Sequence, residues 1–476
     1  MLPGPVLQLS RPPATVRAVY GRACRPLLAL AAMTACGAGM PAEGGGAGAR
    51  GTTTRSKTDS QSALFPESKA GWKQVDRATR ARIDELARDY VAFLGRAKTP
   101  RRAVAALVET FRAAGAVPLG TSLEAGQRAY WTAPGGDAAL LLVGGRGGAA
   151  AGVRAVVAAV DGPRIDLKQV PLYQHDTAAM LETALYGTFD LESWLVRPLA
   201  LYLHLARAKK DIDLVIGEAP GDPVLAIPDV PIHLMKKVQS KEHPVAEPER
   251  MDAYAGGTIA AVEKALRARG LTHADLVEAE AYLVPAGPAA LVGVDRAMVA
   301  GYAQSRLALA YLATRALAAA GGDQAGLAVI LVSKSQVDNA GATGIGFVGR
   351  ALSRAMSAQG GGDEIDVLTS RRGHARTALL IAATARGESN AGVVLSPEGD
   401  DSLPGARRRV LDRLDRVHVP VQFGTGDSDA AVDLGELDLD AVALSLPVRS
   451  LGAPLELCSA LDLHYGLTGL ASWFAP

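Results

Sequence analysis

The chain has 476 residues, 49% of them hydrophobic and 21% charged, as in soluble globular proteins with room for one large core and a second module. Its formal net charge is +1 without a strongly basic block, so nucleic acid and an anionic membrane surface are not expected as partners. The three cysteines form no C-x-x-C pair, which excludes a zinc ribbon or dithiol redox motif, and we expect Cys458 to be a packed thiol.

The first 36 residues resemble a bacterial export signal. Four arginines precede the apolar run PLLALAAM, which is too short to span a bilayer permanently. The end of this leader, Met33-Thr34-Ala35-Cys36, resembles a lipobox, which favours a signal peptide and a lipoprotein held in the cell envelope through a lipid on Cys36. The alternative is a low-complexity extension of a cytoplasmic protein. Residues 37–65 are rich in Gly, Ser and Thr and are expected to form a flexible tether in either case.

From residue 66 onward, the pattern of apolar residues predicts alternating helices and strands. Helical spacing predicts a helix within residues 75–96, and Pro100 begins a second helix that ends before Gly115. A third helix is expected at 304–319. Apolar runs predict buried strands at 138–145, 153–160, 327–332, 377–383, 391–396 and 441–446. This alternation favours an α/β sandwich around a mixed sheet.

Residues 165–283 have a different sequence pattern. Prolines punctuate short alternating segments such as DLVIGE, and this pattern predicts a β-rich module inserted into the α/β layers. Downstream, residues 344–349 match G-x-G-x-x-G, but a long segment separates them from the strand expected at 327–332. A dinucleotide site requires the glycines directly after a strand, so we expect a helix start instead.

A set of short motifs extends along the folded part of the chain. The motifs are PRIDLK at 163–168, PLY at 171–173, RPLAL at 197–201, IPDVPIHL at 227–234, VPAG at 284–287 and GVDR at 293–296. Together they resemble the aspartyl aminopeptidase / aminopeptidase I family of zinc metalloaminopeptidases. The resemblance implies an aminopeptidase-like three-layer α/β sandwich from residues 66–164 and 284–476. It also implies that residues 165–283 form a β-rich dimerisation-type domain, through which family members assemble into dimers and larger shells.

The resemblance also implies a catalytic centre with two zinc ions, His and carboxylate ligands, and a Glu as general base. The motifs align the general base with Ser335 and the ligands with Ala159, Ser305, Gln336, Ala382 and Gly452. None of these residues holds zinc firmly. Loss of the general base alone removes a factor of about 10²–10⁴ from the rate. We therefore expect a catalytically silent member, a pseudoenzyme without a bound cofactor, whose role is binding, scaffolding or regulatory.

Two retained residues leave alternatives open. Asp161 lies beside the first ligand position, and we expect a solvated or capping carboxylate there rather than part of a residual pocket. His233 matches a family His that reaches the neighbouring subunit's active site, so it marks either a retained peptide pocket or a packed contact in an oligomer. The remaining alternatives are an active zinc aminopeptidase that releases acidic N-terminal residues through rearranged ligands, and a subunit that lends His233 to an active paralogue. At least a homodimer is expected.

Overall fold

The structure is a computed structural model that describes residues 71–228, 251–333, 341–361, 377–384, 387–395, 404–424, 429–430 and 441–476. The leader and tether lie outside these residues, and so do Cys36, His233, Ser335 and Gln336. Within the described ranges, no helix combines the length and the apolar character needed to cross a membrane.

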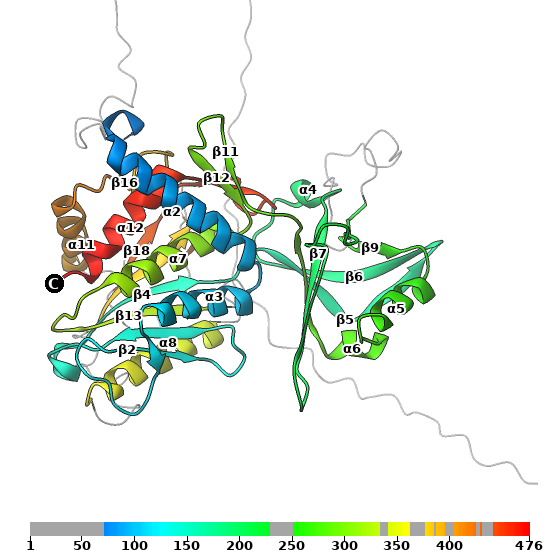
Figure 1. The fold of residues 1–476 in the computed structure, drawn as a ribbon, viewed down its shortest axis with the longest axis horizontal. Coiled ribbons are helices and arrows are strands. Elements are labelled where there is room, and N and C mark those ends of the chain that lie inside the picture. The colour runs from blue at the N-terminus through cyan, green and yellow to red at the C-terminus, as the bar shows by residue number, and fades with distance from the viewer. Residues whose placement is uncertain are drawn as a thin grey trace, which may run out of the picture. The chain divides into compact units, whose positions relative to one another are not determined.

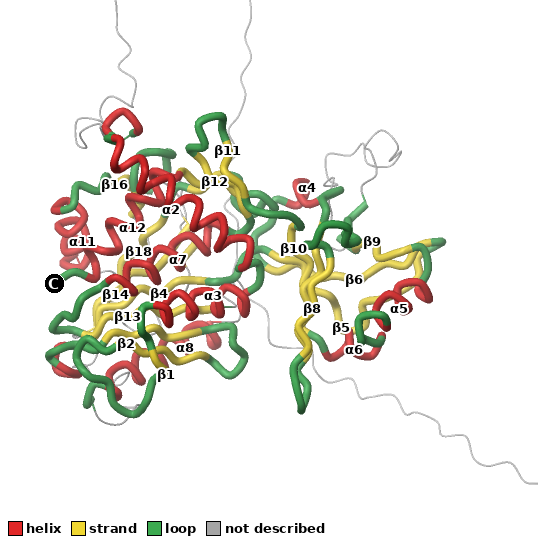
Figure 2. Tube along the Cα trace, in the orientation of Figure 1, coloured by secondary structure: helices red, strands yellow, loops and turns green. Residues whose placement is uncertain are grey.

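A ten-stranded mixed sheet forms the larger part of the fold (Figures 1 and 2). The strands are, in their order across the sheet, β1 (Val117–Pro118), β2 (Arg128–Thr132), β3 (Ala139–Val143), β13 (Gly326–Val332), β4 (Val153–Ala159), β14 (Thr377–Thr384), β18 (Ala441–Ser445), β15 (Val393–Leu395) and β16 (Val421–Phe423), with β17 (Asp429–Ala430) paired to β14. The central pairs β13–β4, β4–β14 and β14–β18 are parallel. Every residue of β13 is buried, as expected for a strand covered on both faces.

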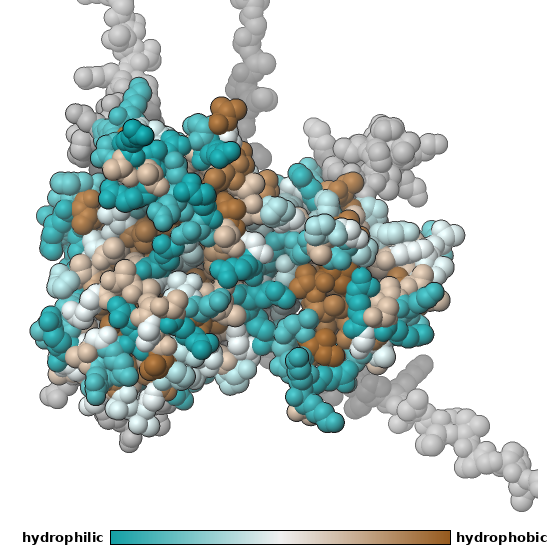
Figure 3. All heavy atoms as spheres, in the orientation of Figure 1, coloured by the Kyte–Doolittle hydropathy of each residue, from teal (hydrophilic) through white to brown (hydrophobic). Residues whose placement is uncertain are grey.

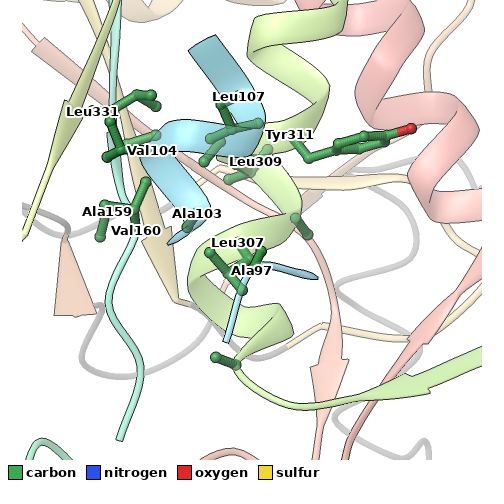
Figure 4. Packing of buried hydrophobic residues seen from close by; sticks show 14 of the residues in the cluster. Ala97, Ala103, Val104, Leu107, Ala159, Val160, Leu307, Leu309, Tyr311 and Leu331 are labelled. Carbon is green, nitrogen blue, oxygen red and sulfur yellow. The ribbon is translucent and has the colours of Figure 1, made fainter. Parts of the chain in front are cut away.

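Helices pack on this sheet and on one another. They are α2 (Arg77–Arg96), α3 (Pro100–Ala113), α7 (Gln304–Ala319), α8 (Gly341–Ala358), α11 (Pro404–Arg416) and α12 (Ala460–Phe474), with short 3-10 turns at Trp72–Gln74 and Gly148–Ala151. Figure 4 shows Val104 and Leu107 of α3 beside Leu331 of β13 and Leu309 of α7. The predicted α/β fold and the helix at 304–319 are confirmed. The glycines at 344–349 lie inside α8, so they form no turn after a strand.

A six-stranded antiparallel sheet is built from the proline-punctuated part of the sequence. Its order is β8 (Ile212–Ile216), β7 (Leu199–Leu205), β10 (Glu280–Pro285), β5 (Arg164–His175), β6 (Ala178–Tyr186) and β9 (Ala253–Gly256). The short helices α4 (Leu191–Trp194), α5 (Ile259–Arg267) and α6 (His273–Glu278) accompany it. The register pairs Leu201 with Ile216 and with Leu283, and it pairs Leu283 with Ile165. These four apolar side chains therefore lie on the same face of the sheet.

A third, four-stranded sheet brings distant segments of the chain to one place. It consists of β11 (Ala290–Val292), β12 (Met298–Gly301), β20 (Glu456–Ser459) and β19 (Val448–Arg449). Gly301 pairs with Glu456, so the start of α7 lies beside the C-terminal strand. Cys458 is a buried free thiol, which confirms the packed state expected for it.

Candidate functional site

Two of the aligned ligand positions, 159 and 382, lie toward the C-terminal ends of neighbouring parallel strands. Ala159 ends β4 and is 1% exposed, and Figure 4 shows its methyl group among the apolar side chains of the core. Ala382 lies on β14, directly after Ile381, which pairs with Val157 of β4. The C-terminal ends of parallel strands meet at one edge of a sheet, which is where α/β proteins commonly place a site. Alanine at 159 offers no donor atom there.

Two further positions meet at a buried carboxylate, that of Glu456. The Ser305 backbone N–H donates to Glu456 Oε2 at 2.7 Å, and the Ser305 hydroxyl donates to Oε1 at 3.0 Å. The Gly452 backbone N–H also donates to Oε1, at 3.1 Å. Glu456 is 0% exposed, so the carboxylate depends on these three partners instead of water. Glu456 thus binds the first turn of α7 to the turn that carries Gly452.

Burial and hydrogen bonding act in opposite directions on the Glu456 carboxyl group. Removal from water raises its pKa to about 7, although the N–H groups of Ser305 and Gly452 favour the charged form. The side-chain amide of Gln304 fixes the adjoining backbone, because Nε2 donates to the carbonyl oxygens of Glu456 at 2.5 Å and of Val299 at 3.0 Å. This carboxylate was missed from the sequence. The available signal was a single acidic residue in the apolar stretch LELCSAL.

Gly452 leaves no room for a side chain. Its φ is +77°, in the left-handed region, and a Cβ atom on it would lie 2.6 Å from the carbonyl oxygen of Thr188. The Gly452 carbonyl is engaged as well, because it accepts the Trp194 indole N–H at 2.8 Å and the Asp190 backbone N–H at 3.1 Å. A His side chain at 452 therefore requires this turn to move.

Asp161 is a fully buried carboxylate, so the solvated alternative of the expected solvated or capping carboxylate is wrong. It is 0% exposed and accepts a hydrogen bond from the Tyr186 hydroxyl. The face of the Tyr186 ring packs on the Arg164 guanidinium, whose centre is 3.7 Å from the ring centroid. Arg164 in turn donates from Nε to Asp166 Oδ1 at 2.8 Å. Tyr186 therefore covers the carboxylate that follows β4 and separates it from water.

The segment after β4 also packs on the start of α7. The Tyr302 hydroxyl donates to the Pro163 carbonyl at 2.8 Å, and Gly162 lies so close to Ala303 that it has no space for a Cβ. The structure thus gathers Ala159, Asp161, Ser305 and Gly452 in one region. It gives no account of Ser335, Gln336 and His233, which lie outside the described residues.

The described residues of this region do not fit a two-zinc centre. The described side chains at the aligned positions are a methyl group at 159, a hydroxyl that already donates to Glu456 at 305, and none at 452. Across the described ranges, no group of three or more His, Cys, Asp and Glu side chains has an arrangement that could hold a metal ion. Zinc sites in proteins need three or four such donors.

A polar cleft, open to solvent, lies beside this region at the end of β13. It is lined by residues of both charges, among them Arg102, Arg164 and Glu280, and by Ser333, whose hydroxyl donates to Asp137 Oδ2 at 2.7 Å. None of the aligned ligand positions in the described ranges lines it.

Comparison with known proteins identifies the family. A family model described as aminopeptidase I zinc metalloprotease (M18) matches residues 93–346. A probable M18 family aminopeptidase 1 of Clostridium acetobutylicum is 30% identical over 326 residues, which cover 63% of this chain and 70% of the relative. An M18 aminopeptidase structure from Thermotoga maritima superimposes with a TM-score of 0.76 at 24% identity, over 86% of this chain and 99% of that one. The mApe1 dodecamer of S. cerevisiae gives 0.65 at 15% identity, over 83% and 97%. The chain therefore belongs to the peptidase M18 family.

Proposed function

We propose that this chain is a catalytically silent M18 protein, a pseudoenzyme that acts by binding and self-assembly rather than by peptide hydrolysis. The observation that carries the proposal is the arrangement around Glu456. The Ser305 hydroxyl and the Gly452 turn are hydrogen-bonded to this carboxylate, at positions where the family resemblance implies metal ligands. Ala159 completes the set without a donor atom.

Peptide hydrolysis in a zinc aminopeptidase needs the metal to activate water and to polarise the scissile carbonyl. To place zinc ligands at Ala159, Ser305 and Gly452, several residues must be substituted. A side chain at 452 also requires the turn that carries it to move. Glu456 is a potential zinc ligand, but one carboxylate does not make a site. The fold and the interfaces of a family can persist when its site is lost. The polar cleft at the end of β13 is where we place the binding role, with a peptide as the expected ligand.

The decisive experiment measures zinc and hydrolysis on the same purified full-length protein. After incubation with zinc and removal of free metal, we expect far less than one zinc per chain by mass spectrometry. We also expect no release of chromophore from aspartyl or glutamyl p-nitroanilide above the rate without protein. A catalytically competent zinc aminopeptidase, treated identically, controls for the reconstitution. About two zinc ions per chain together with chelator-sensitive release would establish the rearranged active enzyme instead.

We further propose that the chain self-associates, at least as a homodimer, through the module at 165–283. Support comes from the motifs RPLAL and IPDVPIHL and from the dodecameric structural neighbour. Sedimentation velocity should give a mass of at least twice the 49.2 kDa of the chain. A strictly monomeric protein at micromolar concentration would contradict this. If the chain is recovered only in a complex with an M18 paralogue, the result favours the alternative in which it lends His233 to the active site of that paralogue.

A further inference from the structure

The six-stranded sheet has an apolar groove on the face that carries α5 and α6. The groove is open to solvent, and twelve of its thirteen lining residues are apolar. Figure 3 shows hydrophobic atoms gathered on this part of the molecule. One wall is formed by sheet residues such as Leu167, Leu181 and Leu201, and the other by Val262 and Leu266 of α5.

The lining decides which class of ligand suits the groove. It offers no side-chain hydrogen-bond donor or acceptor except the guanidinium of Arg269. A peptide segment placed inside would therefore bring backbone N–H and C=O groups into apolar surroundings without partners, at a cost in free energy. A sugar or nucleotide meets the same obstacle. An aliphatic chain does not, because it gains by leaving water and needs no hydrogen bond.

The single charged residue of the lining favours an anionic head group. Arg269 is exposed, and its Nη1 donates a hydrogen bond to the Ala265 carbonyl at 3.1 Å. Among the described residues it forms no ion pair. The Asp222 carboxylate, which interacts with it electrostatically, is already held by the backbone N–H groups of Gly217 and Ala219, both at 3.1 Å. A guanidinium at the edge of an apolar groove is complementary to a carboxylate at the end of a hydrocarbon chain.

We propose that this groove binds one free fatty acid, with the alkyl chain between the sheet and α5 and the carboxylate at Arg269. The apolar lining suits the alkyl chain, and the one cation at its edge is complementary to one carboxylate. The inference does not depend on the catalytic silence of the metal region, because no aligned ligand position in the described ranges lines the groove.

Calorimetric titration of the full-length protein with dodecanoate, decanoate and octanoate, each below its aggregation threshold, tests the proposal. We expect one site per chain and an affinity that falls about fourfold for each methylene removed, because each methylene leaves water on binding. Dodecyltrimethylammonium should bind more weakly than dodecanoate, since its positive charge is repelled by the positive charge of Arg269. An affinity independent of chain length, or no saturable binding, would overturn the proposal.

Two pairs of variants connect the binding to this groove. Ala265 is exposed on α5 and lines the groove, so Ala265→Phe fills it, whereas Ala268→Phe adds the same ring at an exposed position outside the lining. We expect loss of dodecanoate binding only in Ala265→Phe, with thermal melting unchanged in both. Arg269→Gln should weaken dodecanoate binding about fivefold, as for one exposed ion pair, while Arg267→Gln, outside the lining, should not.

The competing occupant of the groove is a second copy of this chain. Light scattering on the Ala265→Phe and Ala268→Phe variants distinguishes the two. If Ala265→Phe alone dissociates an oligomer and the wild-type protein binds no dodecanoate, the groove is a subunit interface and the proposal is wrong. Equal dodecanoate binding by Ala265→Phe and wild type would also refute it, because the ligand would then lie elsewhere.

Discussion

Replacing Glu456 by Gln tests whether the buried carboxylate holds the first turn of α7 against the Gly452 turn. The substitution keeps the size of the side chain but turns one acceptor oxygen into an NH₂ group. Both Glu456 oxygens accept hydrogen bonds, from the Ser305 N–H on one side and from the Ser305 hydroxyl and the Gly452 N–H on the other. Either orientation of the amide therefore leaves one buried N–H facing a donor. Such a loss costs about 1–3 kcal/mol of unfolding free energy.

The pH dependence of the unfolding free energy shows whether the ionisation of Glu456 contributes to stability, which the shape of the side chain alone cannot do. The pKa of Glu456 rises from its ordinary 4.5 to about 7 in the folded protein, because burial disfavours the charged form. The folded protein then binds the proton more tightly than the unfolded chain. The stabilisation is fully present below pH 4.5 and is lost as the pH rises through about 7, and it amounts to about 3 kcal/mol. Gln cannot titrate, so the variant lacks this component.

We therefore expect the stability of the wild type relative to Glu456→Gln to fall by about 3 kcal/mol between pH 4.5 and pH 8. Urea unfolding at several pH values, followed by tryptophan fluorescence, measures the difference. Trp194 is a suitable reporter, because its indole N–H donates to the Gly452 carbonyl at 2.8 Å. Other titrating groups such as Asp462 are common to both proteins and cancel in the comparison. Parallel stability profiles for the two proteins would refute the reasoning.

Three further predictions concern the same region and the leader. Gly452→Ala should cost at least about 2 kcal/mol more than Gly126→Ala in urea unfolding, because both glycines have nearly the same positive φ but only Gly452 has a carbonyl oxygen 2.6 Å from the new Cβ. Ser305→Ala removes one hydrogen bond to Glu456 and should lower the unfolding free energy by about 1 kcal/mol, whereas an unchanged midpoint would show that the hydroxyl contributes nothing. Radioactive palmitate should label the full-length protein in a bacterial host and should not label Cys36→Ser; an unlabelled wild type rules out the lipoprotein.

Apolar patterning was sufficient to predict the elements but not the contacts that make the site. The helix at 304–319 was predicted residue for residue, since the sequence pattern of a helix is local. Glu456 was missed because its partners lie far away in the chain: 151 residues separate it from Ser305. Asp161 was expected to be a solvated or capping carboxylate, and its burial was missed for the same reason. The Tyr186 hydroxyl that covers it comes from the end of β6, and no local pattern indicates that contact.

The contacts around Glu456 suggest how an M18 fold can stay closed at this point without zinc. Two turns from distant parts of the chain meet here, and each exposes backbone N–H groups that must be paired when buried. A metal ion that binds side chains on both turns is one way to join them. The Glu456 carboxylate achieves the same connection through three hydrogen bonds, and it needs neither a ligand at 305 nor a side chain at 452. With such a link in place, the ligand loss proposed above would remove the chemistry without opening the fold. A chelator should therefore leave the melting temperature of this protein unchanged, whereas a structure that depended on zinc would lose the stabilisation that a bound ligand gives.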